Sequence, residues 1–260
     1  MDCSGDPVTS LTRPALFKLD QVERHFGSKV VLEKLSVDIL QSEFLCLLGA
    51  SGCGKSTLLR LLAGLDAPDG GSLNRCLPIS GVGLVFQEPN LLPWRSVLGN
   101  VELPLELKGI NKRDRRAKAL MHLKEVGLHE AADRFPSQLS GGMRMRVSIA
   151  RALVTEPELL LLDEPFSALD EITREDLDQY LRSLFISKKL TVVFVTHSIL
   201  EATYLADRII MMAPGGGRII RDERIQPGYD GDSMHQKPPV HNEIRAGLSR
   251  SLRDSIKVPR

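Results

Sequence analysis

Residues 49–57 have the residue types and spacing needed to bind phosphate groups. They read Gly-Ala-Ser-Gly-Cys-Gly-Lys-Ser-Thr and fit G-x-x-x-x-G-K-[ST], the pattern of a phosphate-binding loop. Glycines allow a tight turn that points backbone N–H groups inward at phosphate oxygens. Lys55 is placed to reach the β- and γ-phosphates of a nucleotide, and the Ser56 hydroxyl is placed to ligate Mg²⁺. The predicted nucleotide contacts are Gly49, Ala50, Ser51, Gly52, Cys53, Gly54, Lys55, Ser56 and Thr57.

The segments around this loop decide between a phosphate site and an ordinary glycine turn before a helix. An apolar run at 44–48 precedes the loop, and a second one at 58–62 follows it. This order predicts a strand, a glycine loop and a helix, which is the context that the motif requires. The positive end of the helix dipole would face the same anion, so the sequence favours the phosphate site.

Asp163 and Glu164 could supply the metal and acid–base chemistry of such a site. They follow the apolar run 159–162, and ligands bind at the carboxyl ends of strands in open α/β sheets. Asp163 suits Mg²⁺, and Glu164 is placed to polarise an attacking water. An Asp-Glu pair after a strand could also cap a helix, but the phosphate loop upstream favours the catalytic interpretation.

A second anion site is predicted at residues 139–143, which read Leu-Ser-Gly-Gly-Met. Ser140 can cap a helix that begins here, and the glycines leave backbone N–H groups exposed. Ser-Gly-Gly is also common in loops. The position of this segment between the phosphate loop and Asp163 favours the anion-site interpretation. Ser140, Gly141 and Gly142 are therefore candidate nucleotide contacts.

Three kinds of hydrophobic pattern must position these residues. Residues 15–48 contain short apolar runs separated by turns, which is typical of strands. Residues 96–155 have helical periodicity and are interpreted as a helical insertion. The continuous runs 159–162 and 190–195 suit a parallel sheet covered on both faces. Further elements are expected as helices at 58–65 and 172–186, a turn at 66–71, a strand at 82–86, and a terminal helix with the stripe Ile244, Leu248, Leu252 and Ile256.

Composition and charge exclude several classes of protein. The chain has 260 residues, enough for one large domain, and 34 basic against 33 acidic residues give a net charge of +1. That balance argues against a strongly basic nucleic-acid binder. No apolar run approaches the roughly 18–20 residues of a membrane span, and no secretory signal is visible. The 4 cysteines lack metal-ligand spacing and disulfide-like density, which fits a reducing cytosol.

These motifs, in this order, resemble those of the ATP-binding subunits of ABC transporters over residues 15–215. The segment 139–143 resembles the signature segment of that family, and 159–164 resembles its Walker B strand. Further positions match the glutamine loop, the D-loop, the switch histidine and the aromatic that stacks on adenine; these are Gln87, Ser167 to Asp170, His197 and Phe26. Taken alone, His197 would more often be an ordinary histidine at a strand end, and Phe26 would more often belong to a core.

The resemblance implies a fold and a division of the chain. The fold would be α/β, with a P-loop NTPase core containing a parallel sheet, an N-terminal antiparallel β subdomain and an inserted helical subdomain. Residues 15–215 would form the ATPase domain, with the helical subdomain at about 88–155. Residues 1–14 would be a flexible N-terminus, and residues 216–260 a short C-terminal extension with an amphipathic helix.

The resemblance also implies Mg²⁺-dependent hydrolysis of ATP in a head-to-tail dimer. The catalytic residues would be Lys55, Gln87, Glu164 and His197, and the Mg²⁺ ligands would be Ser56, Gln87 and Asp163. The second ATPase subunit would supply Ser140 and Gly142 across the interface. Met143 replaces the Gln of the commonest signature, but the Ser140 hydroxyl and the Gly142 N–H remain, so activity is expected to survive.

The signature with Met143 resembles that of importer ATPases for nitrate, sulfonates and taurine, and segments 91–94 and 168–174 resemble the same subgroup. Such a subunit would lie at the cytoplasmic face of the inner membrane as a peripheral protein. It would drive a separate transmembrane permease, and through it a solute-binding protein, with no nucleic acid involved. Residues 88–100, with Leu91, Leu92 and Trp94, would contact the permease, or alternatively pack locally within the helical region.

Two other classes of P-loop protein are alternatives. A soluble ABC ATPase of translation or DNA repair would usually carry two nucleotide domains in one chain or a long coiled-coil insertion. Neither the length of the chain nor a heptad stretch supports that alternative. A P-loop kinase or GTPase would leave residues 140–142 and His197 without a role.

Overall fold

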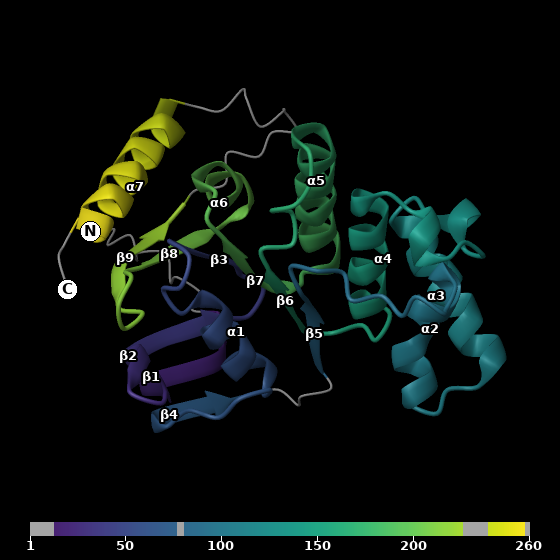
Figure 1. The fold of residues 1–260 in the computed structure, drawn as a ribbon, viewed down its shortest axis with the longest axis horizontal. Helices are drawn as coiled ribbons and strands as arrows, with labels where there is room; N and C mark the ends of the chain where they lie inside the picture. The colour runs from purple at the N-terminus through teal and green to yellow at the C-terminus, as the bar shows by residue number, and fades with distance from the viewer. Residues whose placement is uncertain (1–12, 77–80, 226–238, 258–260) are drawn as a thin grey trace, which may run out of the picture.

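Two β-sheets and a set of helices make up the fold (Figure 1). The computed structural model describes residues 13–76, 81–225 and 239–257. The predicted flexible segment 1–14 therefore lies outside the described residues except for its last two positions. Within the described ranges, no helix combines the length and the apolar character needed to cross a bilayer.

The smaller sheet is antiparallel and has the strand order β2-β1-β4. Its strands are β1 (Ala15–Phe26), β2 (Lys29–Leu40) and β4 (Gly70–Arg75). Gly27 has a φ of 61°, so the turn between β1 and β2 uses a left-handed conformation that glycine adopts without strain. The N-terminal antiparallel sheet is as predicted, whereas β4 begins at the end of the expected turn 66–71.

The larger sheet has the order β5-β6-β7-β3-β8-β9. Its strands are β3 (Phe44–Gly49), β5 (Val82–Val85), β6 (Leu159–Asp163), β7 (Thr191–Thr196), β8 (Arg208–Met212) and β9 (Ile219–Arg224). Neighbouring strands run parallel except β9, which pairs antiparallel with β8 at the edge of the sheet. The predicted parallel sheet is therefore correct for its first five strands and is completed by one antiparallel edge strand.

Both faces of the larger sheet are covered, which explains the continuous apolar runs in its strands. Phe44, Cys46 and Leu48 of β3 face a core shared with the helices on one side. Those helices are α4 (Gly141–Leu153), α5 (Glu171–Lys188), α6 (Ile199–Leu205) and α7 (Pro239–Lys257). Leu45 and Leu47 face the opposite core, which α1 (Lys55–Ala63) and the small sheet complete. Fully burying each such side chain contributes about 1.5–3 kcal/mol.

The helical insertion has a core of its own, beside the β5 edge of the larger sheet (Figure 1). It contains α2 (Val97–Leu107), α3 (Lys112–Glu125), two 3₁₀ turns (His129–Ala131 and Pro136–Gln138) and α4. The side chains of Ser96, Asn111 and Ser140 cap its three α-helices by accepting a backbone N–H bond. This insertion into the α/β core matches the prediction from helical periodicity.

Helix boundaries differ from the predictions in ways that local geometry explains. The first helix was expected at 58–65, but α1 begins at Lys55 and ends at Ala63, because Gly54 and Gly64 both adopt left-handed conformations that bound it. The predicted stripe of the terminal helix lies on α7. Leu248 is fully buried in the main core, and Ile244 and Leu252 pack against that core; the side chain of Ile256 lies outside the described residues.

Candidate functional site

The phosphate-binding loop connects the end of β3 to the start of α1. Gly54 caps α1 with a φ of 105°, and a Cβ placed on it would lie 2.8 Å from the carbonyl oxygen of Val31. A Cβ on Gly49 would lie 2.7 Å from the carbonyl oxygen of Met212. Any side chain at these two positions would collide with backbone, so glycine is needed for the loop to keep its shape.

The Lys55 ammonium is buried at the centre of this loop. Its Nζ donates to the carbonyl oxygens of Gly49 (2.8 Å) and Ala50 (3.1 Å). It also lies 3.6 Å from Glu164 Oε1. The loop therefore holds a cation at its centre, and the N-terminus of α1 adds its own positive potential at the same place.

Ser56 and Asp163 form the neighbouring part of the site. The Ser56 hydroxyl donates a 2.9 Å hydrogen bond to Asp163 Oδ1. Burial raises the pKa of the Asp163 carboxyl above its usual range, while the hydrogen bond from Ser56 opposes that shift. A hydroxyl and a carboxylate side by side are hard oxygen ligands of the kind that Mg²⁺ prefers, and a divalent cation would offset the desolvation of Asp163.

Glu164 lies at the end of β6 between two polar partners. Its Oε1 faces Lys55 at 3.6 Å, and its Oε2 lies 3.0 Å from Nδ1 of His197. An ionised carboxylate only accepts hydrogen bonds, so this contact requires the proton on Nδ1 of the imidazole. The backbone of Glu164 has a φ of 42°, an uncommon conformation for a residue other than glycine that is often found at functional sites.

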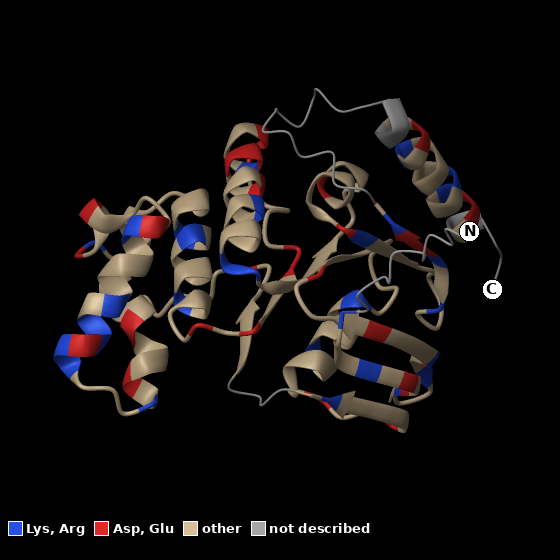
Figure 2. Cartoon of the chain, turned by 180° about the vertical axis from the view of Figure 1, so that it is seen from behind, with Lys and Arg blue, Asp and Glu red and all other residues tan. Residues whose placement is uncertain are grey.

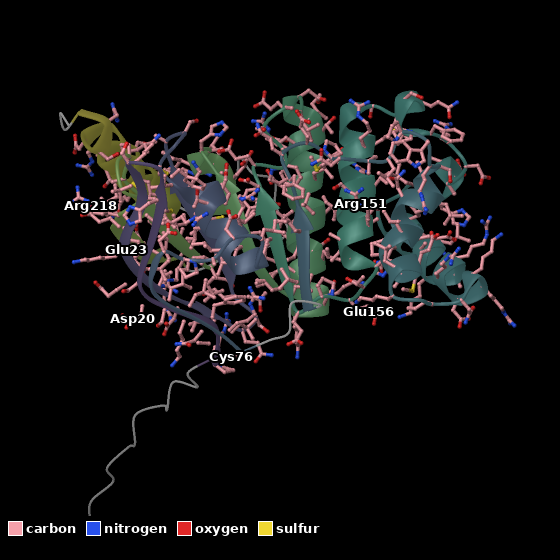
Figure 3. The ribbon with its side chains drawn as sticks, turned by 60° about the horizontal axis from the view of Figure 1, so that its bottom comes forward. Asp20, Glu23, Cys76, Arg151, Glu156 and Arg218 are labelled. Atoms are coloured by element: carbon pink, nitrogen blue, oxygen red, sulfur yellow. The ribbon has the colours of Figure 1, made fainter. Side chains whose placement is uncertain are left out.

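Gln87 follows β5 and reaches the segment after Glu164. Its amide Nε2 donates to the Ser167 hydroxyl at 3.2 Å, and that hydroxyl donates to the carbonyl oxygen of Glu164 at 3.0 Å. Arg151 of α4, at the border between the helical insertion and the sheet (Figure 3), donates to the carbonyl oxygens of Pro89 and Asn90, both at 2.8 Å. The segment after Gln87 is thereby tied to the helical insertion.

A cavity of about 520 Å³ brings most of the predicted site residues together. It is lined by Phe26, Lys29, Val31, Ser51, Gly52, Gly54, Lys55, Ser56, Thr57, Gln87, Asp163 and Glu164. Phe26 is 50% exposed at its rim, with the Arg24 guanidinium 4.9 Å from the ring centroid. An exposed aromatic ring at the edge of a phosphate site is suited to stack on a planar base.

Some predicted contacts do not line this cavity. Gly49 and Ala50 contribute carbonyl oxygens to Lys55 instead. Cys53 is buried, with its Sγ 3.9 Å from Lys55 Nζ, and burial raises the pKa of its thiol despite that ammonium. His197 is solvent-exposed and joins the site only through Glu164.

Ser140, Gly141 and Gly142 do not line this cavity and lie at the start of α4 instead. The exposed Ser140 caps α4, with Oγ accepting from the backbone N–H of Met143 at 3.2 Å. Gly142 is buried against α5, where an added Cβ would lie 2.4 Å from Thr173 Cγ2. Within one chain, the structure therefore keeps the second predicted anion site away from the first.

Sequence reasoning missed Lys29, Val31 and Arg151. Lys29 and Val31 alternate along β2 directly after the turn at Gly27 and line the cavity. That alternation, next to Phe26, could have indicated them. Arg151 lies in a helix whose apolar stripe drew attention to its neighbours, and no local pattern indicates that its guanidinium reaches Pro89 and Asn90.

Charge is spread over the chain without a dominant sign. Figure 2 shows Lys and Arg interspersed with Asp and Glu along the ribbon. No group of three or more His, Cys, Asp or Glu side chains within the described ranges could hold a metal ion. A cation at this site would need ligands from phosphate oxygens or water in addition to Ser56 and Asp163.

Comparisons with known proteins agree with this geometry. The family model described as ABC transporter matches residues 32–167. The aliphatic sulfonates import ATP-binding protein SsuB 1 of Mesorhizobium japonicum is 47% identical over 215 residues, covering 78% of this chain and 80% of that protein. The taurine import ATP-binding protein TauB of Rhizobium johnstonii is 44% identical over 215 residues, covering 79% and 82%. A solved dimeric structure of the ATP-binding cassette MJ0796, in a post-hydrolysis state bound to ADP and Pi, matches with a TM-score of 0.71 at 36% identity, covering 81% of this chain and 99% of that chain.

Proposed function

The chain belongs to the ABC transporter family of ATP-binding cassettes, and from this we propose that it powers import of a small sulfonate-, taurine- or nitrate-like solute through a separate membrane permease. It is an ATPase subunit that binds ATP, as the resemblance in its motifs predicted. One observation supports the reaction most directly: Glu164 lies between Lys55 and His197 at the mouth of the phosphate loop.

We assign the following roles to the chain's own residues during hydrolysis. The backbone N–H groups of the loop and the Lys55 ammonium bind the phosphate oxygens, and Lys55 neutralises charge that develops on the γ-phosphate. Glu164 orients and polarises the attacking water. His197, held by Glu164 at 3.0 Å, fixes the carboxylate in that position, and Gln87 borders the same space.

The donors present fit a bound Mg²⁺. Ser56 and Asp163 would hold it, with Gln87 at the cavity wall as a further oxygen ligand. Bound there, the cation would neutralise charge on the transferring phosphoryl group. The hydroxyl of Ser56 and the carboxyl of Asp163, 2.9 Å apart, support this role because both are oxygen ligands facing one place.

We further propose a head-to-tail dimer in which each ATP lies between two copies of the chain. Ser140 and Gly142 would meet the nucleotide bound by the partner. The exposed cap position of Ser140 and its separation from the cavity of its own chain support this arrangement. The comparison structure of MJ0796 is itself dimeric.

The proposed permease contact is the segment 88–100 with the groove beside it. Trp94 is 72% exposed, which favours a partner, whereas Leu91 packs against the core of the helical insertion. A groove of about 370 Å³ lies between β5, α2 and α4, and Arg151 joins that groove to the segment by its bonds to Pro89 and Asn90.

We propose that residues 15–215 act as the ATPase domain, with residues 88–155 as its helical subdomain. Residues 216–260 would be a short C-terminal extension, which contributes β9 and α7. The protein would work as a peripheral subunit at the cytoplasmic face of the inner membrane, served through the permease by a solute-binding protein.

Uptake into proteoliposomes tests this proposal. The chain would be reconstituted with a sulfonate-type permease and its binding protein, and uptake of labelled taurine, methanesulfonate and nitrate would be measured with internal ATP. We expect uptake of one solute class with the wild-type chain and none with Glu164→Gln. Equal uptake by both, or ATP hydrolysis that never couples to any solute, would contradict the proposed import function.

A further inference from the structure

Glu201 of α6 is a buried carboxylate that follows the exposed His197 in the chain by one helical turn. Glu201 is 5% exposed and does not line the nucleotide cavity. Burial raises the pKa of its carboxyl, and the hydrogen bond from Thr196 and the Arg174 charge oppose that shift. A carboxylate taken out of water in this way destabilises a fold unless its partners compensate, so its contacts indicate what it holds.

Its first partners lie on both sides of His197 in the chain. The Thr196 hydroxyl, at the end of β7, donates a short hydrogen bond to Glu201 Oε2. The same hydroxyl oxygen accepts the backbone N–H of Ser198 at 2.9 Å, and the Ser198 hydroxyl accepts the N–H of Glu201 at 3.3 Å. The carboxylate of Glu201 therefore holds Thr196 directly, and Ser198 is held through the Thr196 hydroxyl and the backbone N–H of Glu201.

Its second partner is on α5. Glu201 Oε1 lies 3.7 Å from Nε of Arg174, and this Nε is buried without a hydrogen-bond partner among the described residues. Another nitrogen of the same guanidinium, Nη2, donates to the carbonyl oxygen of Leu169 at 2.9 Å. Arg174 thus connects Glu201 to the turn that leads from Glu164 into α5.

That turn and the first turn of α5 lie against the start of α4. A Cβ on Gly141 would be 3.5 Å from Leu169 Cδ2, and one on Gly142 would be 2.4 Å from Thr173 Cγ2. The packing leaves no space between Gly142 and Thr173, so a shift of α5 must also move the segment that carries Ser140. Contacts therefore run without a break from His197, through Glu201 and Arg174, to the second anion site.

We propose that Glu201 is a positioning residue that holds His197 against Glu164 and, through Arg174, connects the hydrolysis site of its own chain to Ser140. This inference rests on the proposed function, in which His197 and Ser140 act on the two different nucleotides of a dimer. Glu201 touches no nucleotide. It acts by fixing the backbone on both sides of His197 and by tying that backbone to α5.

Steady-state kinetics of Glu201→Gln provide the first test. The amide keeps the size of the side chain but weakens both the Thr196 and the Arg174 contacts. We expect kcat for ATP to fall about tenfold with KM unchanged, because Glu201 touches no nucleotide and a displaced His197 would weaken the hydrolysis step and leave ATP binding as it is. Glu43→Gln is the matched control: Glu43 is 3% exposed and lies 3.6 Å from Arg208, but at the end of β3 away from the phosphate loop. Its kcat should stay within about twofold of wild type.

A double mutant separates positioning from general destabilisation. If Glu201 acts through His197, adding Glu201→Gln to His197→Ala should lower kcat by less than about twofold, because residues in one network are non-additive. A purely structural effect would lower kcat by the full factor again and would overturn the proposal. Thr196→Ser keeps the hydroxyl and should retain the wild-type kcat, whereas Thr196→Val should reproduce the loss.

Two outcomes distinguish this inference from the proposed function itself. If wild type hydrolyses ATP, Glu164→Gln does not, and Glu201→Gln has the wild-type kcat, the inference fails while the proposed function stands. If the wild type itself fails to hydrolyse ATP, the proposed function fails. If Glu201→Gln does not fold, Arg174→Gln replaces it as the test variant, because Arg174 is the more exposed partner in the Glu201–Arg174 pair. A kcat about tenfold lower than wild type supports the proposal, and an unchanged kcat overturns it.

Discussion

The hydroxyl of Ser56 donates a 2.9 Å hydrogen bond to Asp163 Oδ1, although the two residues are 107 positions apart. Ser56 lies in the first turn of α1 after β3, and Asp163 ends β6, with β7 between these two strands in the sheet. Strands that run parallel end at one edge, so their carboxyl ends bring loop and carboxylate together. This contact brings the two proposed metal ligands together, and the other residues of the candidate site are arranged around it.

Replacing Lys55 by Ala should weaken ATP binding itself. The ammonium is buried within the loop and is the one charged side chain that we assign to the β- and γ-phosphates. Loss of charge-assisted hydrogen bonds worth about 1.5–3 kcal/mol predicts about 10- to 100-fold weaker binding. Equilibrium titration with ATP measures it, and Lys118→Ala, which removes an exposed lysine paired with Glu156, should bind like wild type. Unchanged affinity in Lys55→Ala would count against the phosphate-loop assignment.

Replacing Ser140 by Arg should abolish hydrolysis while leaving ATP binding to the isolated chain intact. Ser140 does not line the cavity of its own chain, and in the proposed dimer the larger side chain would obstruct the nucleotide of the partner. Titration of the variant with ATP is the deciding measurement, with circular dichroism to check the fold. Binding lost together with hydrolysis would mean that Ser140 acts within its own chain, and the head-to-tail arrangement would lose its support.

Mixing Ser140→Arg with Lys55→Ala gives a second readout of the same arrangement. In a mixed head-to-tail dimer, both lesions fall on one composite site, and the other site pairs an intact Lys55 with an intact Ser140. Partial recovery of phosphate release from two inactive proteins is the expected result. Such recovery has no explanation if each chain forms a complete site alone.

Replacing Trp94 by Ser should separate hydrolysis from coupling to the permease. The indole is largely exposed, so its loss leaves the chain's own core intact. We expect the purified chain to hydrolyse ATP at the wild-type rate but to copurify poorly with a co-expressed permease. Exposed Phe135→Ser, in the same helical insertion, is the control. Full copurification of the Trp94 variant would remove this residue from the contact.

His122 should make the stability of the chain sensitive to acid. The side chain is 1% exposed on α3, and burial lowers its pKa below the usual 6.5, although Glu125 opposes that shift. The unfolded chain therefore binds the proton more readily, so the free energy of unfolding falls as the pH drops below about 6.5. Urea unfolding from pH 7.5 to 5 should show a smaller decline for His122→Gln than for wild type. The exposed His129→Gln should follow wild type; identical curves for all three would refute the assignment.

Continuous sequence patterns predicted the parts of the fold that they span. The apolar runs of β3, β6 and β7 are buried on both faces, and such runs have few alternatives in an α/β chain. β8 and β9 were not predicted. β9 has two isoleucines followed by four charged residues, so its sequence carries no strand alternation, and its pairing with β8 defines it. The boundaries of α1 depended on the backbone conformation of Gly54 and Gly64, which residue type alone does not determine.

The residues of the candidate site also divide into those that a local motif indicates and those that only tertiary packing brings together. The phosphate loop is contiguous, so its residue types and spacing identify it. Cys53 lies within that motif, yet its thiol points into the interior, because loop geometry decides which members face the cavity. Glu201 and Arg174 have no local signal, since their relationship exists only once α5 and α6 pack together. Motifs therefore indicate groups that touch the ligand better than groups that hold those in place.

The most direct test is a paired measurement of ATP binding and phosphate release for wild type and Glu164→Gln. The amide keeps the shape of the side chain but polarises water poorly, and loss of such a group lowers rates by about 100- to 10,000-fold. We expect phosphate release to fall by that amount, ATP affinity to remain at the wild-type value, and an ATP-held dimer to accumulate on size exclusion. A Glu164→Gln variant that releases phosphate at the wild-type rate would contradict the account at its centre.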